Sequence, residues 1–92
     1  MAFFLIRQKV SSFKRWKQVF DSVTMLRKAG GERSYKIFRR PEDPNEVILF
    51  LEWDNIRNAM KYFENKIFRA ALKKAGVLTK PVLYLPHEGF EL

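Results

Sequence analysis

The chain has 92 residues, no cysteine and a single histidine, His87. The absence of cysteine excludes disulfides, thiolate metal sites and a cysteine nucleophile, and one histidine cannot build a multi-histidine metal site within one chain. The formal net charge of +8 is spread along the sequence without a block of like charges, which favours a solvated surface over a nucleic-acid site. We therefore expect no metal and disfavour nucleic acid as a partner.

Hydrophobic residues make up 47% of the chain, a rich core for a domain of this size, and the excess fits burial in an oligomer. The apolar stretch at residues 1–6 ends at Arg7 and is too short for a membrane span or a signal peptide. We expect a single domain over residues 1–92 with a short tail at 86–92. We also expect a cytoplasmic location and no membrane partner.

The first part of the chain predicts a strand, a helix and a second strand. Residues 2–10 alternate as a strand. One face of this strand carries Phe4, Ile6, Gln8 and Val10. The next segment follows the N-cap candidates Ser11 and Ser12, and its apolar residues recur at the helical steps of three and four. That stripe is Phe13, Trp16, Phe20 and Val23. Gly30 and Gly31 end the helix, and residues 33–39 alternate as the second strand.

The remaining elements follow a turn at residues 41–45. Residues 46–53 form the third strand, and Asp54 can cap the helix after it. The predicted inward stripe of that helix is Ile56, Ala59, Met60 and Phe63. Asn65 breaks the helix and caps a continuation that ends at Gly76. Residues 80–86 are the last strand, with a proline near each end, as an edge strand allows.

The third strand is apolar on both of its faces. Val47, Leu49, Leu51 and Trp53 point one way, and Ile48 and Phe50 point the other way. A strand in a two-layer domain of this size should have one wet face, so a second copy of the chain is the expected cover. The sequence does not decide which of the two sets faces that partner.

The order β-α-β-β-α-β predicts an α+β, ferredoxin-like fold with a four-stranded antiparallel sheet and helices on one face. This topology serves many functions and does not choose one. The third strand lacks the glycine of an RNA-recognition motif, and the chain has no phosphate-binding glycine-rich loop.

Short matches spread from about Arg7 to Leu85 resemble the dimeric α+β barrel superfamily, in particular its antibiotic-biosynthesis-monooxygenase-like group. They are residues 10–16, Phe20 with Asp21, Leu26 with Arg27, Phe38 with Arg39, residues 43–47, residues 52–54, Ala59, Phe63, residues 75–77 and Pro81. Each match is weak alone, but together they keep their order and spacing.

The resemblance implies a homodimer in which two sheets pair through their open faces to form a barrel. It also implies a pocket between each sheet and its own helices. Activities known in the superfamily include cofactor-independent oxygenation of polycyclic aromatics, haem degradation, lactone isomerisation and polyketide cyclisation. The sequence carries no cofactor signature, and we expect no cofactor for this protein.

Three residues are the candidate ligand contacts: Gln8, Arg27 and Trp53. Gln8 stands where many similar proteins have a histidine, and a polar group on that face can orient a ligand by hydrogen bonding. Arg27 matches a recurrent basic position and can hold a substrate oxygen, as can Arg39. Trp53 can line a pocket for a flat aromatic molecule.

Each candidate also has a structural interpretation. Trp53 is the kind of bulky aromatic residue that fills a core at a strand end. The arginines can form salt bridges to an acid, for which we consider Asp43, Glu52 and Asp54. His87 lies in the tail without an orienting partner in the sequence, so we assign it no catalytic role.

We therefore expect the protein to bind a small apolar or aromatic molecule between the sheet and the helices. If it is an enzyme, the reaction is a cofactor-independent oxygenation, cyclisation or isomerisation, and its catalytic residues are unknown. One alternative is a non-enzymatic ligand-binding or interaction module. The other is nucleic-acid binding through the basic helical faces.

Overall fold

A computed structural model describes residues 1–78 and 82–84 of the chain. The elements, in chain order, are β1 (Ala2–Lys9), α1 (Phe13–Ser22), α2 (Thr24–Gly30), β2 (Glu32–Arg40), β3 (Asp43–Trp53), α3 (Ile56–Phe63), α4 (Lys66–Lys74) and β4 (Val82–Tyr84). The predicted β-α-β-β-α-β order is confirmed, with each predicted helical region divided into two helices. The predicted strand 80–86 is described only at 82–84, and its flanking prolines and His87 lie outside the described residues.

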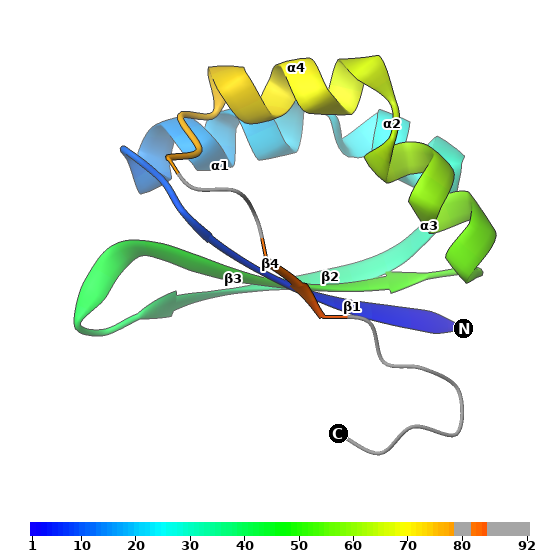
Figure 1. Cartoon of the computed structure of the whole chain (residues 1–92), viewed down its shortest axis with the longest axis horizontal. Helices are drawn as coiled ribbons and strands as arrows, with labels where there is room; N and C mark the ends of the chain where they lie inside the picture. The colour runs from blue at the N-terminus through cyan, green and yellow to red at the C-terminus, as the bar shows by residue number, and fades with distance from the viewer. Residues whose placement is uncertain (79–81, 85–92) are drawn as a thin grey trace.

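The sheet has the order β2-β3-β1-β4, and every neighbouring pair is antiparallel. Three long strands form most of it, while β4 contributes three residues beside β1. All four helices lie on one side of the sheet (Figure 1). We call the face under the helices the closed face and the other the open face. This is the predicted α+β ferredoxin-like arrangement.

The register of β1 and β3 assigns the two apolar sets of β3. Leu49 pairs with Ile6 and Val47 with Gln8, so these residues share the closed face. Val47, Leu49, Leu51 and Trp53 are each at most 5% exposed. Ile48 and Phe50 point to the open face and are only partly buried. Ile48 and Phe50 are therefore the residues of β3 that are available to a partner.

The first helical region breaks at Val23, where a single continuous helix was predicted. Val23 has φ −107° and ψ 18°, outside the helical conformation. The hydroxyls on either side bond backbone carbonyls: Ser22 Oγ donates to Val19 O at 2.6 Å, and Thr24 Oγ1 donates to Asp21 O at 2.8 Å. Such side-chain bonds compete with helical pairing. The region is therefore divided into α1 and α2, and Arg27 of α2 is buried, with 2% of the residue exposed.

Two predictions about the second helical region need correction. Asn55, and not Asp54, caps α3, because its side chain accepts from Asn58 N at 2.8 Å. Asp54 instead accepts from Asn58 Nδ2 at 3.0 Å. The inward stripe is also displaced, since Ile56 is 45% exposed while Tyr62 is buried.

The other predicted helix signals are confirmed. Ser12 caps α1 by accepting from Arg15 N, and Asn65 caps α4 by accepting from Ile67 N. Gly76 has φ +74° just after α4, the left-handed conformation that favours glycine. Within residues 1–78 and 82–84, none of the helices has the length and apolar character needed to cross a membrane.

Candidate functional site

A cavity of about 340 Å³ lies between the closed face and the helices. Its walls come from β1, β3 and all four helices. The lining residues are Ile6, Gln8, Trp16, Val19, Phe20, Val23, Arg27, Leu49, Leu51, Tyr62, Phe63, Phe68, Arg69, Ala71, Leu72 and Ala75. Most are apolar, and few polar groups converge on the space, as in small-molecule sites.

Gln8 is the polar residue that the sheet contributes to this cavity. Strand alternation on β1 puts it on the closed face beside Ile6, and its side chain is buried with 4% of the residue exposed. Its carbonyl oxygen Oε1 has no hydrogen-bond partner among the described residues. A buried acceptor without a partner is costly, and native structures contain few of them. The sequence-based choice of Gln8 therefore falls on the cavity wall.

Arg27 also lines the cavity, but its guanidinium donates hydrogen bonds to groups of the protein itself. It donates from Nε to Glu32 Oε2 at 2.6 Å, from Nη1 to Phe20 O at 2.5 Å and from Nη2 to Thr24 Oγ1 at 3.2 Å. The guanidinium carbon lies 3.6 Å from the centre of the Phe20 ring. Both side chains of the Arg27–Glu32 ion pair are 2% exposed.

The acid that pairs with Arg27 is thus Glu32, and our three sequence-based choices, Asp43, Glu52 and Asp54, were wrong. Burial raises the pKa of the Glu32 carboxyl, and the charge of Arg27 opposes this shift. Arg27 supplies the charge that a buried carboxylate needs, so the pair brings little net charge to the cavity.

Tyr62 is a cavity residue that we did not place on the inward stripe. It comes from α3, is 5% exposed, and packs between Trp53 and Phe68 with ring centres 5.1 and 4.8 Å away. Burial raises its pKa to about 12, although Arg27 acts in the opposite direction. The phenol thus stays neutral at physiological pH. Tyr62 lies three residues after Ala59 on α3, and this helical spacing was the sequence signal that both residues share the buried face of the helix.

Trp53 lies behind the cavity wall, since the pocket does not reach it. It is fully buried, and its indole N–H donates to Gly30 O at 2.8 Å. A side chain on Gly30 would meet the indole ring at 3.3 Å, so this glycine makes room for it. Trp53 supports Tyr62 and Phe63 from below, at ring distances of 5.1 and 6.0 Å.

Arg39 lies away from the cavity. Its guanidinium carbon lies 3.9 Å from the centre of the Phe13 ring, and Nε donates to Pro44 O at 2.9 Å. These contacts fasten the β2–β3 hairpin to the start of α1. His87, the remaining sequence-based candidate, lies outside the described residues.

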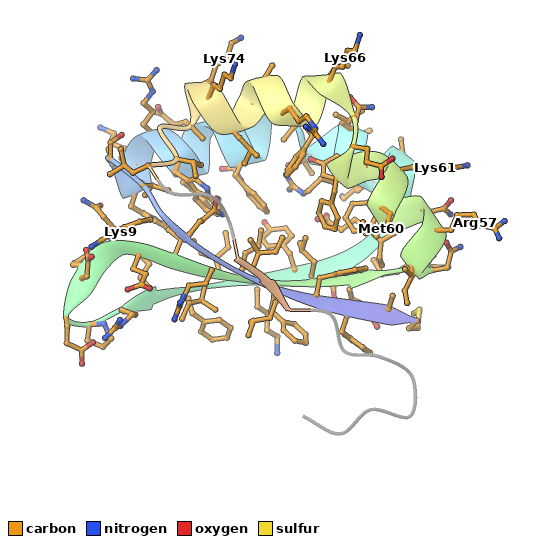
Figure 2. The ribbon with its side chains drawn as sticks, viewed as in Figure 1. Lys9, Arg57, Met60, Lys61, Lys66 and Lys74 are labelled. Atoms are coloured by element: carbon orange, nitrogen blue, oxygen red, sulfur yellow. The ribbon has the colours of Figure 1, made fainter. Side chains whose placement is uncertain are left out.

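Helices α3 and α4 carry six exposed cations, of which Arg57, Lys61, Lys66 and Lys74 are labelled in Figure 2. They are Arg57, Lys61, Lys66, Arg69, Lys73 and Lys74. None of the salt bridges found among the described residues involves any of them. Lys66 and Lys74 point away from the sheet in Figure 2.

Solved structures show which class of fold this arrangement belongs to. The chain has the fold of solved structures that are named as antibiotic biosynthesis monooxygenases and of a cofactor-independent oxygenase. The resemblance drawn from the sequence is therefore confirmed at the level of the fold. No family model matches the chain, and no curated protein matches it by sequence.

Three of the similar structures illustrate the likeness. A Bordetella bronchiseptica protein named as an antibiotic biosynthesis monooxygenase has a TM-score of 0.78 at 14% identity, with 94% of each chain covered. SnoaB, a cofactor-independent oxygenase from Streptomyces nogalater, has a TM-score of 0.72 at 14% identity, covering 90% of this chain and 89% of SnoaB. A Caulobacter crescentus protein, also named as such a monooxygenase, has a TM-score of 0.73 at 16% identity, covering 91% and 85%.

Proposed function

We propose that the protein binds a small apolar or aromatic molecule in the cavity on the closed face. The observation that carries this proposal is a space of about 340 Å³ whose described lining residues are mostly apolar, with few polar groups among them. A space of this size is at the lower end of the range for small-molecule sites. Burying an apolar ligand there removes its surface from water, which is the main driving force for such binding.

Binding is better supported than proton-transfer catalysis. None of the described residues that line the cavity is a carboxylate or a histidine, so no usual general base faces a bound molecule. Tyr62 keeps its proton up to high pH, because burial raises its pKa to about 12. Its neutral hydroxyl suits donation to a ligand oxygen, including one that gains charge during cofactor-independent oxygenation or isomerisation.

We further propose that the protein acts as a homodimer joined through the open face. Among residues 1–78, the apolar residues of that face include Phe3, Leu5, Phe38, Ile48 and Phe50. Phe3 and Phe50 stack at 5.7 Å, and Phe38 is 53% exposed. A second copy of the same face covers this surface in an arrangement with two-fold symmetry.

A cavity-filling variant tests the proposed ligand site. Ala71→Phe places a ring inside the cavity, whereas Ala70→Phe adds the same ring to an exposed position on the same helix. With 1-naphthol as the probe in calorimetry, we expect binding by the wild type and by Ala70→Phe and at least a tenfold loss for Ala71→Phe. Equal affinity of both variants, with circular dichroism showing both folded, would place the probe elsewhere.

Polyanion binding along α3 and α4 is the second candidate function, because the six exposed cations have no acidic partner in the salt bridges found among the described residues. Retention on heparin that falls steeply with salt is the expected sign of this function. Elution at low salt would remove it, and would leave the charges as a solvated surface.

A further inference from the structure

The cavity differs in charge between its buried part and its opening. Arg27, the buried cation of the lining, is paired with Glu32. Arg69, the exposed cation of the lining, takes part in none of the salt bridges found among the described residues. From this difference, and resting on the proposed function, we propose that the ligand is amphipathic. Its apolar body fills the cavity, and an anionic head group at the opening meets Arg69.

Arg69 lies where the cavity meets solvent. It belongs both to the cavity lining and to the exposed residues of α4, and a residue with both properties stands at an opening. Its lining neighbours Phe68, Ala71 and Leu72 are themselves only partly buried. An arginine lays its aliphatic stem along apolar surface and keeps its guanidinium in water. A group that emerges from the cavity therefore comes within reach of this guanidinium.

The guanidinium of Arg69 has donors to offer a ligand. No hydrogen bond or salt bridge of its side chain is found among the described residues. Helix α4 contains no acidic residue, and Lys66 and Lys73 lie three residues before and four residues after Arg69, which is the spacing of neighbours on one helix face. The charge at the opening is thus positive, and the fork of an arginine matches a carboxylate.

The buried part of the cavity sets the orientation of the ligand. Arg27 donates to Glu32 at 2.6 Å and also to Phe20 O and Thr24 Oγ1. An anion placed there would lose its water and compete with Glu32 for the guanidinium. At the opening, by contrast, a head group keeps most of its water, so it approaches Arg69 at little desolvation cost. The ligand therefore enters with its apolar end first.

Two probes with the same body test the head group: 4-(1-naphthyl)butanoate and 4-(1-naphthyl)butan-1-ol. Calorimetry on the wild-type protein at pH 7 and low salt is expected to give about fivefold tighter binding of the butanoate, the scale of one well-placed ion pair that stays in contact with water. Because salt screens such a contact, the preference should fall below about twofold at ~1 M salt.

Three variants assign the preference to its residue, with the ratio of the two affinities as the readout. Arg69→Met removes the guanidinium and keeps an apolar side chain, so it should bind both probes about equally. Arg69→Lys keeps the charge and should keep much of the preference. Arg57→Met removes a guanidinium from an exposed position outside the cavity lining. It lowers the net charge by the same one unit as Arg69→Met, and it should keep the wild-type preference.

Other outcomes overturn the inference in distinguishable ways. Equal binding of the two probes by the wild type contradicts the amphipathic class, while the cavity site stands if Ala71→Phe weakens both. A preference that survives in Arg69→Met, or that falls equally in Arg57→Met, contradicts the role of Arg69 and assigns the attraction to the basic surface as a whole. Failure of both probes to bind overturns the proposed function itself, and this inference with it.

Discussion

The two faces of one strand, β3, show how similar side chains serve different purposes. Leu49 and Leu51 on the closed face are 5% and 1% exposed, and they form core and cavity wall together. Ile48 and Phe50 alternate with them on the open face, where no element of the described chain covers them. The difference comes from which layer lies above each face, and not from the composition of the strand.

The polar groups of the two faces differ in the same way. On the closed face, Arg27 and Glu32 form an ion pair with both side chains 2% exposed. On the open face, Arg40 contacts Glu46 at 2.9 Å with Arg40 48% exposed, and exposed pairs of this kind add little stability. The closed face therefore depends on specific polar contacts, whereas the open face depends on what covers it.

The largest expected effect is that of breaking the buried ion pair. Arg27→Met leaves the Glu32 carboxylate buried without its cation, and removing one partner of such a pair costs about 3–5 kcal/mol. Urea unfolding at fixed protein concentration measures this loss. Arg57→Met, at an exposed position of α3, is the matched control and should change stability by less than about 0.5 kcal/mol. A loss below about 1 kcal/mol for Arg27→Met would mean that the pair is not needed.

A charge on the open face should have the next largest effect, and it should act on assembly. Phe50→Asp places two carboxylates near the centre of the proposed dimer interface, and we expect a loss of about 2 kcal/mol or more in association free energy. Sedimentation velocity should show a wild-type dimer and a monomeric variant. The exposed Gln18→Asp should stay dimeric. A wild-type monomer at micromolar concentration would contradict the proposed assembly.

The smallest expected effect is a gain in stability. Gln8→Met replaces a buried acceptor that has no partner among the described residues by an apolar side chain of similar length, and we expect unfolding to become less favourable by about 1 kcal/mol. Thermal unfolding without ligand measures the shift. A lower melting temperature for Gln8→Met would show that Oε1 is satisfied in the free protein, by water or by another group.

Much of this fold could be predicted because its signals are local. Alternation along β1 and β3 grouped Gln8 with Ile6 and Leu49 with Leu51, although it left open which set of β3 faces a partner. Ser12 and Asn65 cap helices where expected. The break at Val23 was missed because apolar spacing continues through it, while the hydroxyls of its two neighbours bond the backbone instead.

The candidate site could be predicted only in part, since a cavity depends on how layers pack. The face of Gln8 followed from strand alternation, but its missing partner did not. Arg27 was chosen because it matches a recurrent basic position of the resemblance, whereas its pairing with Glu32 depends on the turn at Gly31, which has φ +120°. Trp53 was chosen for its size, and the same size makes it core, with its N–H used by Gly30 O.

The most direct test of the closed-face site uses the neighbours Leu49 and Ile48, which point to opposite faces of β3. Intermolecular nuclear Overhauser effects can be recorded between bound 1-naphthol and the methyl groups of the two residues. We predict contacts from the ring protons to Leu49 and Ala71 and none to Ile48. Contacts to Ile48 without contacts to Leu49 would place the ligand on the open face and contradict the account.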